Sequence, residues 1–263
     1  MTELSKGFAV VTGASSGIGA AYAERLAKRG YDLILVARRE DRLRAVAKKI
    51  SEESGRKAEI VVADLSDRAS LKRVEDLLRN DKRVTMLVNN AGLGAGAPFL
   101  ASDVDNMSSL LAVNVDALMR LTYAAVPAFV EAKRGTVINI SSSVGVTPEI
   151  LNGVYGGSKA FVLAFSQSLR QELTDKGVTL QVVLPGATAT EIWETVGLPL
   201  SALPKEWVMS TEDMVDAALV GLDKGEFVTA PSLPDTSEWE AYDAARQAVG
   251  KNLSLSVPAA RYR

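Results

Sequence analysis

The stretch 12-TGASSGIG-19 follows a short apolar run, Phe8–Thr12, and leads directly into a segment with helical periodicity. Its glycines Gly13, Gly17 and Gly19 permit a tight turn and a close approach of the backbone to a ligand. Free N–H groups at the start of the following helix suit an anion such as a pyrophosphate. The stretch therefore predicts a phosphate-binding turn between a strand and a helix. The spacing is G-x-x-x-G-x-G and not the common G-x-G-x-x-G, so a purely structural tight turn is the alternative.

Short apolar runs alternate with longer segments of helical periodicity along the chain. The runs are Phe8–Thr12, Leu33–Ala37, Ile60–Ala63, Met86–Val88, Val137–Ile140, Leu180–Leu184 and Phe227–Thr229. The helical segments are Ile18–Arg29, Arg42–Ser54, Leu71–Arg79, Leu110–Ala132, Phe161–Thr174 and Met214–Leu222. Most runs are typical of strands buried on both faces, and the alternation indicates right-handed βαβ units. The sequence therefore predicts an α/β fold with a parallel sheet between helices, and ligands beyond the carboxyl ends of the strands.

The composition excludes several kinds of chemistry and of partner. The chain has no cysteine and no histidine, which excludes disulfides, thiolate nucleophiles, imidazole bases and metal sites built on those ligands, and no metal is expected. The formal charge of −2, with both signs scattered along the chain, offers no basic surface for nucleic acid or membrane. Proton transfer must therefore use Tyr, Lys, Asp or Glu.

The length of 263 residues fits one domain over residues 1–263. No apolar run approaches the roughly 20 residues of a membrane span, and Met1–Lys6 leads into the first strand without a signal-peptide core, so a cytoplasmic location is expected. Residues 191–210 break the strand–helix rhythm and are expected to form a lid over a substrate pocket, or alternatively a surface excursion packed by its own aromatic side chains. Residues 231–263 form a C-terminal extension whose role the sequence does not indicate.

Two arginines end the second predicted strand, in 36-VARRE-40. An NAD-preferring site usually places an acidic residue in this neighbourhood, on the ribose hydroxyls. The guanidinium groups of Arg38 and Arg39 match a 2′-phosphate in charge and in fork geometry, which favours NADP over NAD. The alternative is an exposed basic helix start that pairs with the acidic residues beside it. Asp64, after the third strand, would accept a hydrogen bond from the adenine amine or cap the next helix.

These motifs and others further along resemble the short-chain dehydrogenase/reductase superfamily over most of residues 7–230. The motifs that carry the resemblance are 12-TGASSGIG-19, 64-DL-65, 89-NNAG-92, Asn114, 141-SSS-143, 155-YGGSK-159 and 185-PGATAT-190, all in the family's order. The resemblance implies a Rossmann-type doubly wound sheet in three α/β/α layers, with strand order 3-2-1-4-5-6-7. It also implies NAD(P)-linked oxidation or reduction of an alcohol/carbonyl pair.

The resemblance also implies most of the residues expected to bind the cofactor. With Arg38 and Arg39 they are Gly13, Ser15, Ser16, Gly17, Ile18, Gly19, Asp64, Leu65, Asn90, Ala91, Gly92, Tyr155, Lys159, Pro185, Gly186, Thr188 and Thr190. The 90–92 segment would lie beside the adenine ribose, and the 185–190 segment would flank the nicotinamide. By the same resemblance, Asn114 would hold a helix distortion and a proton-relay water, and Ser142 would hold the substrate oxygen.

The pair Tyr155 and Lys159 supplies a proton carrier in a chain without histidine. At i and i+4 of a helix start, the two side chains lie one turn apart on the same face. A free phenol has a pKa near 10, but a nearby ammonium and an oxidised nicotinamide would favour the phenolate. Tyr155 is therefore predicted to be the general acid/base, with Lys159 lowering its pKa and reaching the nicotinamide ribose. The alternative is a chance spacing, and the Gly-Gly between the two residues is unexplained.

The leading hypothesis is an NADPH-dependent oxidoreductase that interconverts a small-molecule carbonyl and a secondary alcohol. An apolar part of the substrate would be bound by Leu93, Ala95, Val144, Ile150, Leu151, Ile192 and Trp193. The alternative is an NADP-binding sensor without turnover, against which the presence of Asn114, Ser142, Tyr155 and Lys159 argues. A homodimer or homotetramer is expected through Asp116–Lys133 and Tyr155–Lys176, whose apolar content exceeds what one buried face needs.

Overall fold

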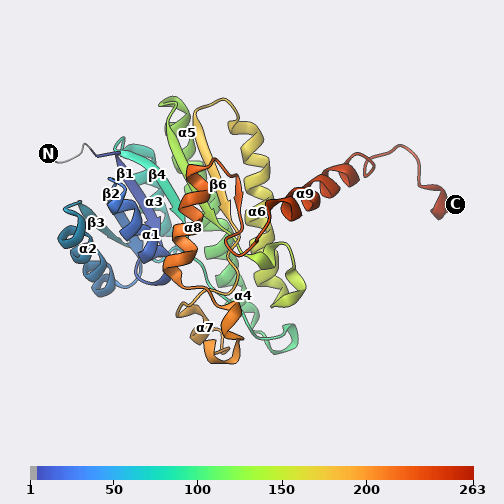
Figure 1. Ribbon diagram of the computed structural model, residues 1–263, viewed down its shortest axis with the longest axis horizontal. Coiled ribbons are helices and arrows are strands. Elements are labelled where there is room, and N and C mark those ends of the chain that lie inside the picture. The colour runs from blue at the N-terminus through green and yellow to red at the C-terminus, as the bar shows by residue number, and fades with distance from the viewer. Residues whose placement is uncertain (1–4) are drawn as a thin grey trace. The chain divides into compact units, whose positions relative to one another are not determined.

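A seven-stranded sheet forms the centre of the computed structural model, which describes residues 5–263 (Figure 1). The strands are β1 (Phe8–Thr12), β2 (Asp32–Ala37), β3 (Ala58–Val62), β4 (Val84–Asn89), β5 (Gly135–Ile140), β6 (Val178–Val183) and β7 (Val228–Thr229). Their order is β3-β2-β1-β4-β5-β6-β7, and every neighbouring pair is parallel. The predicted Rossmann-type order is therefore confirmed.

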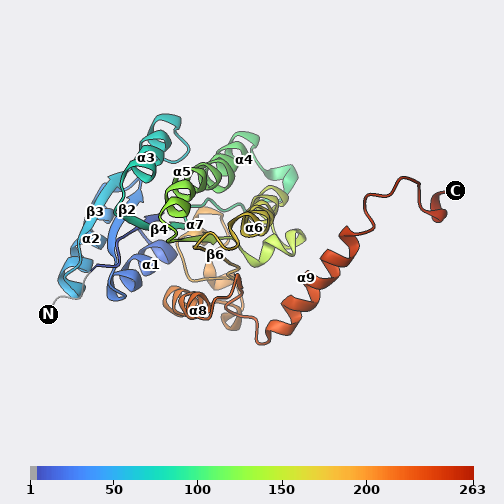
Figure 2. The same cartoon turned by 90° about the horizontal axis from the view of Figure 1, so that it is seen from above.

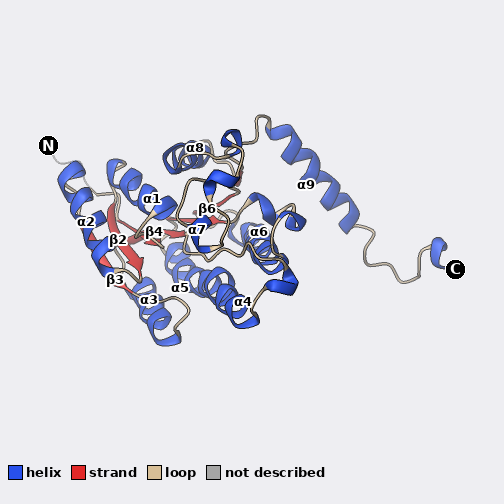
Figure 3. Ribbon diagram, turned by 90° about the horizontal axis from the view of Figure 1, so that it is seen from below, coloured by secondary structure: helices blue, strands red, loops and turns tan. Residues whose placement is uncertain are grey.

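Helices cover both faces of the sheet, which confirms the three-layer arrangement (Figures 2 and 3). The helices of the main unit are α1 (Gly17–Lys28), α2 (Glu40–Ser54), α3 (Arg68–Asn80), α4 (Val104–Leu111), α5 (Leu118–Glu131), α6 (Gly153–Leu173), α7 (Ile192–Thr195) and α8 (Thr211–Asp223). Helices α1, α2 and α8 lie on one face, and α3 to α6 lie on the other. Successive residues of a strand point to opposite faces of the sheet. Ala9 and Val11 therefore pack in the core beneath α1, α2 and α8, while Val10 packs in the core beneath α3 and α5.

The inner strands are buried on both faces, as their unbroken apolar sequences predict, but the edge strand β3 is not. Every residue of β1 and β4 is buried, whereas all five residues of β3 are partly or fully exposed. An edge strand has a neighbour on one side alone, so its side chains are less completely covered. The strand β3 is therefore not among the strands buried on both faces.

One long helical run, Val104–Glu131, crosses the second face without interruption. It starts well before the predicted Leu110, because the Asp103 carboxylate caps it by accepting hydrogen bonds from the backbone N–H groups of Asp105 and Asn106. By length and apolar composition this run could span a membrane, which differs from the expectation drawn from the sequence. Half of its most apolar window is buried inside the protein, as in the core helix of an α/β domain.

The helix α6 begins at Gly153, just before the helix start predicted at Tyr155 and ahead of the periodic run predicted from Phe161. The side chain of Asn152 caps it, accepting a hydrogen bond from the Val154 N–H at 2.9 Å. The same side chain donates to the Ala97 carbonyl at 2.7 Å and so ties the helix start to the loop after β4. The early start places Tyr155 and Lys159 in the first turns of a 21-residue helix.

A compact unit extends up to Pro231, and Ser232–Arg263 forms a second unit. The second unit contains α9 (Thr236–Gly250), whose start is capped by the Asp235 carboxylate accepting from the Ser237 N–H. None of the residues of α9 is buried. On this helix the rings of Trp239 and Tyr242 lie 5.3 Å apart.

Candidate functional site

The glycine-rich turn after β1 is a backbone cradle at the start of α1. Gly13 and Gly17 have φ of +67° and +53°, a left-handed conformation that favours glycine. At Gly19 a Cβ would lie 2.3 Å from the Gly13 carbonyl oxygen, so the helix approaches the loop too closely for any side chain. The Ser16 side chain, at the N-cap position, makes no capping bond to α1. The first N–H groups of a 12-residue helix therefore suit an anionic ligand, as the sequence predicts.

Thr12 and Asn90 fix this cradle to the neighbouring strand. The Thr12 hydroxyl accepts from the N–H groups of Asn90 and Ala91, both at 3.0 Å, and donates to the Val88 carbonyl. The Asn90 amide donates to the Thr12 carbonyl at 2.8 Å. Asn90 thus supports the loop backbone, and Thr12 is a supporting residue that the sequence prediction missed. Its position as the last residue of β1 was the available signal.

A basic cluster lies beside the cradle, and it is larger than the sequence predicts. The Arg39 guanidinium donates to Ser16 Oγ at 3.0 Å and lies near Ser15 Oγ, while Arg38 is 3.9 Å from the Asp64 carboxylate. Arg42, which the prediction missed, joins them through Glu191, whose carboxylate binds both Arg42 and Arg39. The cluster therefore places three guanidinium groups near the glycine-rich turn after β1.

Asp64 lies at the end of β3 but does not cap the next helix. Its Oδ1 accepts from the Ser66 N–H at 2.9 Å and from the Ser66 hydroxyl at 2.7 Å. The N-cap of α3 is Asp67, whose carboxylate accepts from the Ser70 N–H. The capping alternative for Asp64 is therefore wrong. The neighbouring Leu65 is buried in the core, and the adenine contact of Asp64 stays a prediction.

Asn114 lies in a π-helical turn, Ala112–Ala117, between α4 and α5. Its side-chain oxygen accepts from the Leu93 N–H at 2.8 Å, and its amide donates to the Leu93 carbonyl and to Ser158 Oγ. A π-turn shifts the helix register by one residue, which lets the Asn114 amide point into the loop after β4. Asn114 therefore ties the loop after β4 to the start of α6.

Ser142, Tyr155 and Lys159 come together at the carboxyl end of β5. A side-chain hydrogen bond joins Ser142 to Tyr155. The Lys159 ammonium donates to the Ile140 carbonyl at 3.0 Å and lies 5.9 Å from the centre of the Tyr155 ring. Ser141 helps to hold this arrangement, because its hydroxyl donates to the Lys159 carbonyl at 2.7 Å. The structure therefore assembles the three residues that the sequence predicts to carry the proton chemistry.

Burial shifts the pKa values of Tyr155 and Lys159 in opposite directions. Burial raises the pKa of Tyr155, and the hydrogen bond with Ser142 lowers it by less. Burial lowers the pKa of Lys159 to about 8. The phenol is therefore protonated at neutral pH, and the lysine is mostly charged. Burial thus acts against the predicted lowering of the Tyr155 pKa.

The two glycines between Tyr155 and Lys159 have different surroundings. At Gly156 a Cβ would lie 2.9 Å from Pro148 Cβ and 3.0 Å from the Pro148 carbonyl oxygen, so the short helix η4 (Pro148–Ile150) packs directly on the backbone of α6. At Gly157 a Cβ would meet nothing within 4 Å. Close packing against Pro148 thus explains the first glycine, and nothing in the structure explains the second.

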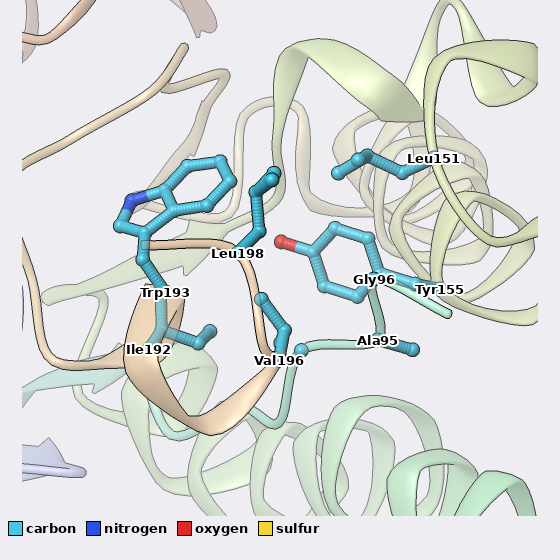
Figure 4. A pocket seen from close by; sticks show the side chains of 9 residues that line it. Ala95, Gly96, Leu151, Tyr155, Ile192, Trp193, Val196 and Leu198 are labelled. Atoms are coloured by element: carbon cyan, nitrogen blue, oxygen red, sulfur yellow. The ribbon is translucent and has the colours of Figure 1, made fainter. Parts of the chain in front are cut away.

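An apolar pocket lies in front of the Tyr155 hydroxyl (Figure 4). Its lining consists of Gly94, Ala95, Gly96, Leu151, Tyr155, Ile192, Trp193, Val196 and Leu198. Ala95, Leu151, Ile192 and Trp193 belong to the predicted set, whereas Leu93, Val144 and Ile150 do not line this pocket. At Gly94 a Cβ would lie 2.7 Å from Val196 Cγ1, so the glycines of one wall allow the opposite wall to approach.

The segment after β6 runs from the cofactor side of the site to the pocket. Thr190 Cγ2 would lie 3.1 Å from a Cβ on Gly17, which places Thr190 against the phosphate loop. The Thr188 hydroxyl donates to the Gly186 carbonyl, and the Thr188 carbonyl accepts from the Trp193 indole N–H at 2.8 Å. The Pro185 carbonyl accepts from the Ser143 N–H at 2.9 Å. Residues 185–193 thus connect the phosphate loop, β5 and the pocket.

No group of three or more carboxylates able to hold a metal ion occurs within residues 5–263. Glycines without room for side chains form the cradle, and arginines form the cluster beside it, so the residues present fit a dinucleotide with a charged adenosine end.

The family model described as short chain dehydrogenase matches residues 7–199. The chain belongs to the short-chain dehydrogenase family. This family comprises oxidoreductases that interconvert CH–OH and C=O groups. The match extends from the strand β1 to the pocket-lining segment and so includes every part of the site described above.

Solved structures of this family resemble nearly the whole chain. A short-chain dehydrogenase from Sphingobium yanoikuyae in complex with NADPH is 45% identical, covers 98% of this chain and 100% of that chain, and has a TM-score of 0.95. A bulky-bulky ketone specific alcohol dehydrogenase from Comamonas testosteroni is 39% identical, covers 97% and 98%, and has a TM-score of 0.90.

Curated relatives match over the dehydrogenase unit. The very-long-chain 3-oxoacyl-CoA reductase of Bos taurus is 38% identical over 189 residues, which cover 70% of this chain and 60% of the relative. The chain thus matches about three fifths of the length of the first such relatives.

Proposed function

We propose that this short-chain dehydrogenase is an NADPH-dependent oxidoreductase that interconverts a ketone bearing apolar substituents and the corresponding secondary alcohol. The proposal rests on the position of the Tyr155 hydroxyl, which faces a pocket whose other lining residues are apolar. This hydroxyl is hydrogen-bonded to Ser142 and lies beside the buried Lys159. The relatives named for 3-oxoacyl-CoA reduction and for bulky ketones support a substrate of this class.

The proton chemistry follows from the geometry of these three residues. In the reducing direction, the Ser142 hydroxyl and the Tyr155 phenol both donate hydrogen bonds to the carbonyl oxygen, and the phenol transfers its proton to the developing alkoxide. When bound, the nicotinamide supplies the hydride or accepts it. The Lys159 ammonium stabilises the phenolate left behind and would hold the ribose hydroxyls of a bound cofactor. Asn114 ties the loop after β4 to the start of α6. Oxidation of the alcohol reverses each step.

The basic cluster supports NADP(H) over NAD(H). Arg38 and Arg39 carry positive charge at the end of β2, and the solved relative from Sphingobium yanoikuyae is a complex with NADPH. A dianionic 2′-phosphate would accept hydrogen bonds from these guanidinium groups, whereas the free ribose of NAD(H) offers them no charged oxygen. Gly13, Ser15, Ser16, Gly17, Ile18 and Gly19 would hold the pyrophosphate.

The substrate class is tested by measuring NADPH consumption with a panel of ketones, aldehydes and diketones of increasing apolar bulk. We expect kcat/KM to rise with the size of the apolar substituents and aliphatic or aryl ketones to exceed charged keto acids, because the pocket lining carries no charged side chain. Tight NADPH binding without consumption of any panel member would instead support the alternative, an NADP-binding sensor.

The cofactor preference is tested by Arg38→Asp. The aspartate is expected to repel a 2′-phosphate and to accept hydrogen bonds from a free ribose, so the NADPH/NADH ratio of kcat/KM should fall by about 100-fold, as a lost charge-assisted bond and an added repulsion predict. Arg44→Asp is the matched control, because Arg44 is an exposed arginine on α2 that pairs with Glu40. An unchanged ratio in Arg38→Asp would contradict the assignment of the cluster.

A further inference from the structure

Glu191 connects the pocket-lining segment to the basic cluster. Arg42 Nη1 donates to both oxygens of the Glu191 carboxylate, at 2.6 and 2.8 Å, and Arg39 Nη1 donates to Oε2 at 3.3 Å. The hydrogen bond from Arg42 is the largest cause that holds the pKa of Glu191 below its usual range. The carboxylate is therefore anionic at neutral pH and attracts both guanidinium groups.

Arg39 is shared between two parts of the site. Its Nη2 donates to Ser16 Oγ at the start of α1, and its Nη1 donates to Glu191 at the start of α7. The guanidinium thus lies between the phosphate loop and the pocket-lining segment. A 2′-phosphate bound at the end of β2 would draw on the same donors that now hold Glu191.

The position of Glu191 in the chain gives this ion pair a consequence for the substrate. Ile192 and Trp193 follow it directly, and both line the apolar pocket. Val196, which directly follows the last residue of α7, packs against Gly94 on the opposite wall. An anchor at residue 191, together with the hydrogen bond from the Trp193 indole to the Thr188 carbonyl, therefore holds one wall of the pocket in position.

The ion pairs are exposed, with side-chain exposures of 43% for Arg39, 40% for Arg42 and 49% for Glu191. Exposed ion pairs contribute little to folding stability. They do fix local geometry when one carboxylate is held by two guanidinium groups, and they change the local potential that a dianionic ligand experiences. We therefore expect Glu191 to affect the binding of ligands and the position of residues 191–198, called the α7 segment.

We propose that Glu191 is a positioning and cofactor-selectivity residue, whose carboxylate anchors the α7 segment to Arg39 and Arg42 and competes with the 2′-phosphate of NADP(H) for Arg39. The inference rests on the proposed function, since it requires a dinucleotide in the cradle. A cofactor with a 2′-phosphate takes Arg39 and leaves the α7 segment anchored by Arg42. A cofactor without it leaves both anchors in place. Free-energy coupling is reciprocal, so release of the segment also strengthens phosphate binding.

The variant Glu191→Gln separates the two roles. We expect the Kd of NADPH, measured by ligand fluorescence without substrate, to fall about threefold, since an exposed charge acts over this range, while the Kd of NADH stays constant. The KM for the ketone should rise several-fold with either cofactor, and kcat should change less. The effect on NADPH should shrink as salt is raised from low to high ionic strength. Glu191→Asp should restore part of the wild-type behaviour.

For the variant Arg42→Gln we expect the Kd of NADPH to change in the direction opposite to that in Glu191→Gln. Without Arg42, Glu191 pairs with Arg39 alone, so the Kd of NADPH should rise about threefold while that of NADH again stays constant. The KM for the ketone should rise as in Glu191→Gln. Loosening of the segment by itself would shift both variants in the same direction, so the opposed signs distinguish competition for Arg39 from a structural role.

The matched control is Glu194→Gln, an exposed carboxylate of the same short helix that forms no ion pair with any residue of the described chain. It should leave both Kd values and KM unchanged. If Glu191→Gln and Glu194→Gln have the same Kd for NADPH, the inference is overturned. The proposed function would be unaffected by that result. Equal binding of NADPH and NADH by the unaltered protein would overturn the cofactor assignment, and the inference with it.

Discussion

Replacing Tyr155 with phenylalanine is expected to lower kcat/KM for the best ketone of the panel by about 10³-fold, within the range that a general acid contributes. The phenol is the proton donor facing the pocket, and burial keeps it protonated at neutral pH by raising its pKa. The ring itself remains, so the α6 start and the pocket wall are retained. The Kd of NADPH should therefore stay within about twofold of the unaltered value, since one hydroxyl to the cofactor is worth little net free energy.

The control for this experiment is Tyr123→Phe. Tyr123 lies on α5 and is 68% exposed, so removal of its hydroxyl tests the chemical change alone. It should leave kcat/KM unchanged. Undiminished turnover in Tyr155→Phe would contradict the assigned proton donor, and a parallel loss of NADPH binding would show that the hydroxyl holds the cofactor instead.

Replacing Lys159 with methionine is expected to lower kcat/KM by about 10² to 10³-fold, because the phenolate loses its stabilising charge and the cofactor ribose loses a donor. The same change should raise stability. Lys159 is 7% exposed and its pKa is lowered from 10.5 to about 8 by burial. At 1.36 kcal/mol per unit, the charged lysine costs the fold about 3 kcal/mol at neutral pH. The Ile140 carbonyl loses its donor in the variant, which leaves a net gain of about 1–2 kcal/mol.

The gain in folding stability that we expect for Lys159→Met depends on pH. Below about pH 8, Lys159 is protonated in the folded and the unfolded chain, so the unaltered protein carries the full cost of a buried charge. Between about 8 and 10.5 the unfolded chain binds more protons than the folded one, so the stability of the unaltered protein rises with pH relative to that of the variant. The advantage of Lys159→Met should therefore decline across this window.

Urea unfolding of both proteins from pH 7 to pH 10 measures this difference. Lys224→Met, at an exposed lysine after α8, is the matched control and should show no such trend. A stability difference that is constant from pH 7 to 10, or that grows, would contradict the buried charge. Loss of activity with gain of stability would identify Lys159 as a residue kept for function at the expense of the fold.

Much of the fold was predictable because its signals are local. The strand β1 has the predicted bounds, Phe8–Thr12, since five consecutive buried residues read directly as an apolar run. The start of α4 was placed too late, because its cap Asp103 precedes a stretch that looks irregular in sequence, whereas the helix start predicted at Tyr155 lies close to the observed cap Asn152. The sequence did not indicate which strand would be exposed, since the exposure of the edge strand β3 depends on where it lies in the sheet.

The site was predictable to a similar extent and for a similar reason. Tyr155 and Lys159 could be paired because four residues of helix separate them. Arg42 and Glu191 could not, because 149 residues separate them in the chain and neither belongs to a motif. The need for Gly156 was likewise invisible, since it arises from contact with Pro148.

The sequence by itself determined the alternation of strands and helices, the glycine turn and the residue types able to move a proton in a chain without histidine or cysteine. These properties depend on neighbours within one or two turns of the backbone. Tertiary structure alone decided which groups meet: Ser142 with Tyr155, a buried Lys159 with its lowered pKa, and Glu191 with Arg39 and Arg42. Burial and long-range contact depend on how the layers pack, and that packing is a property of the whole chain.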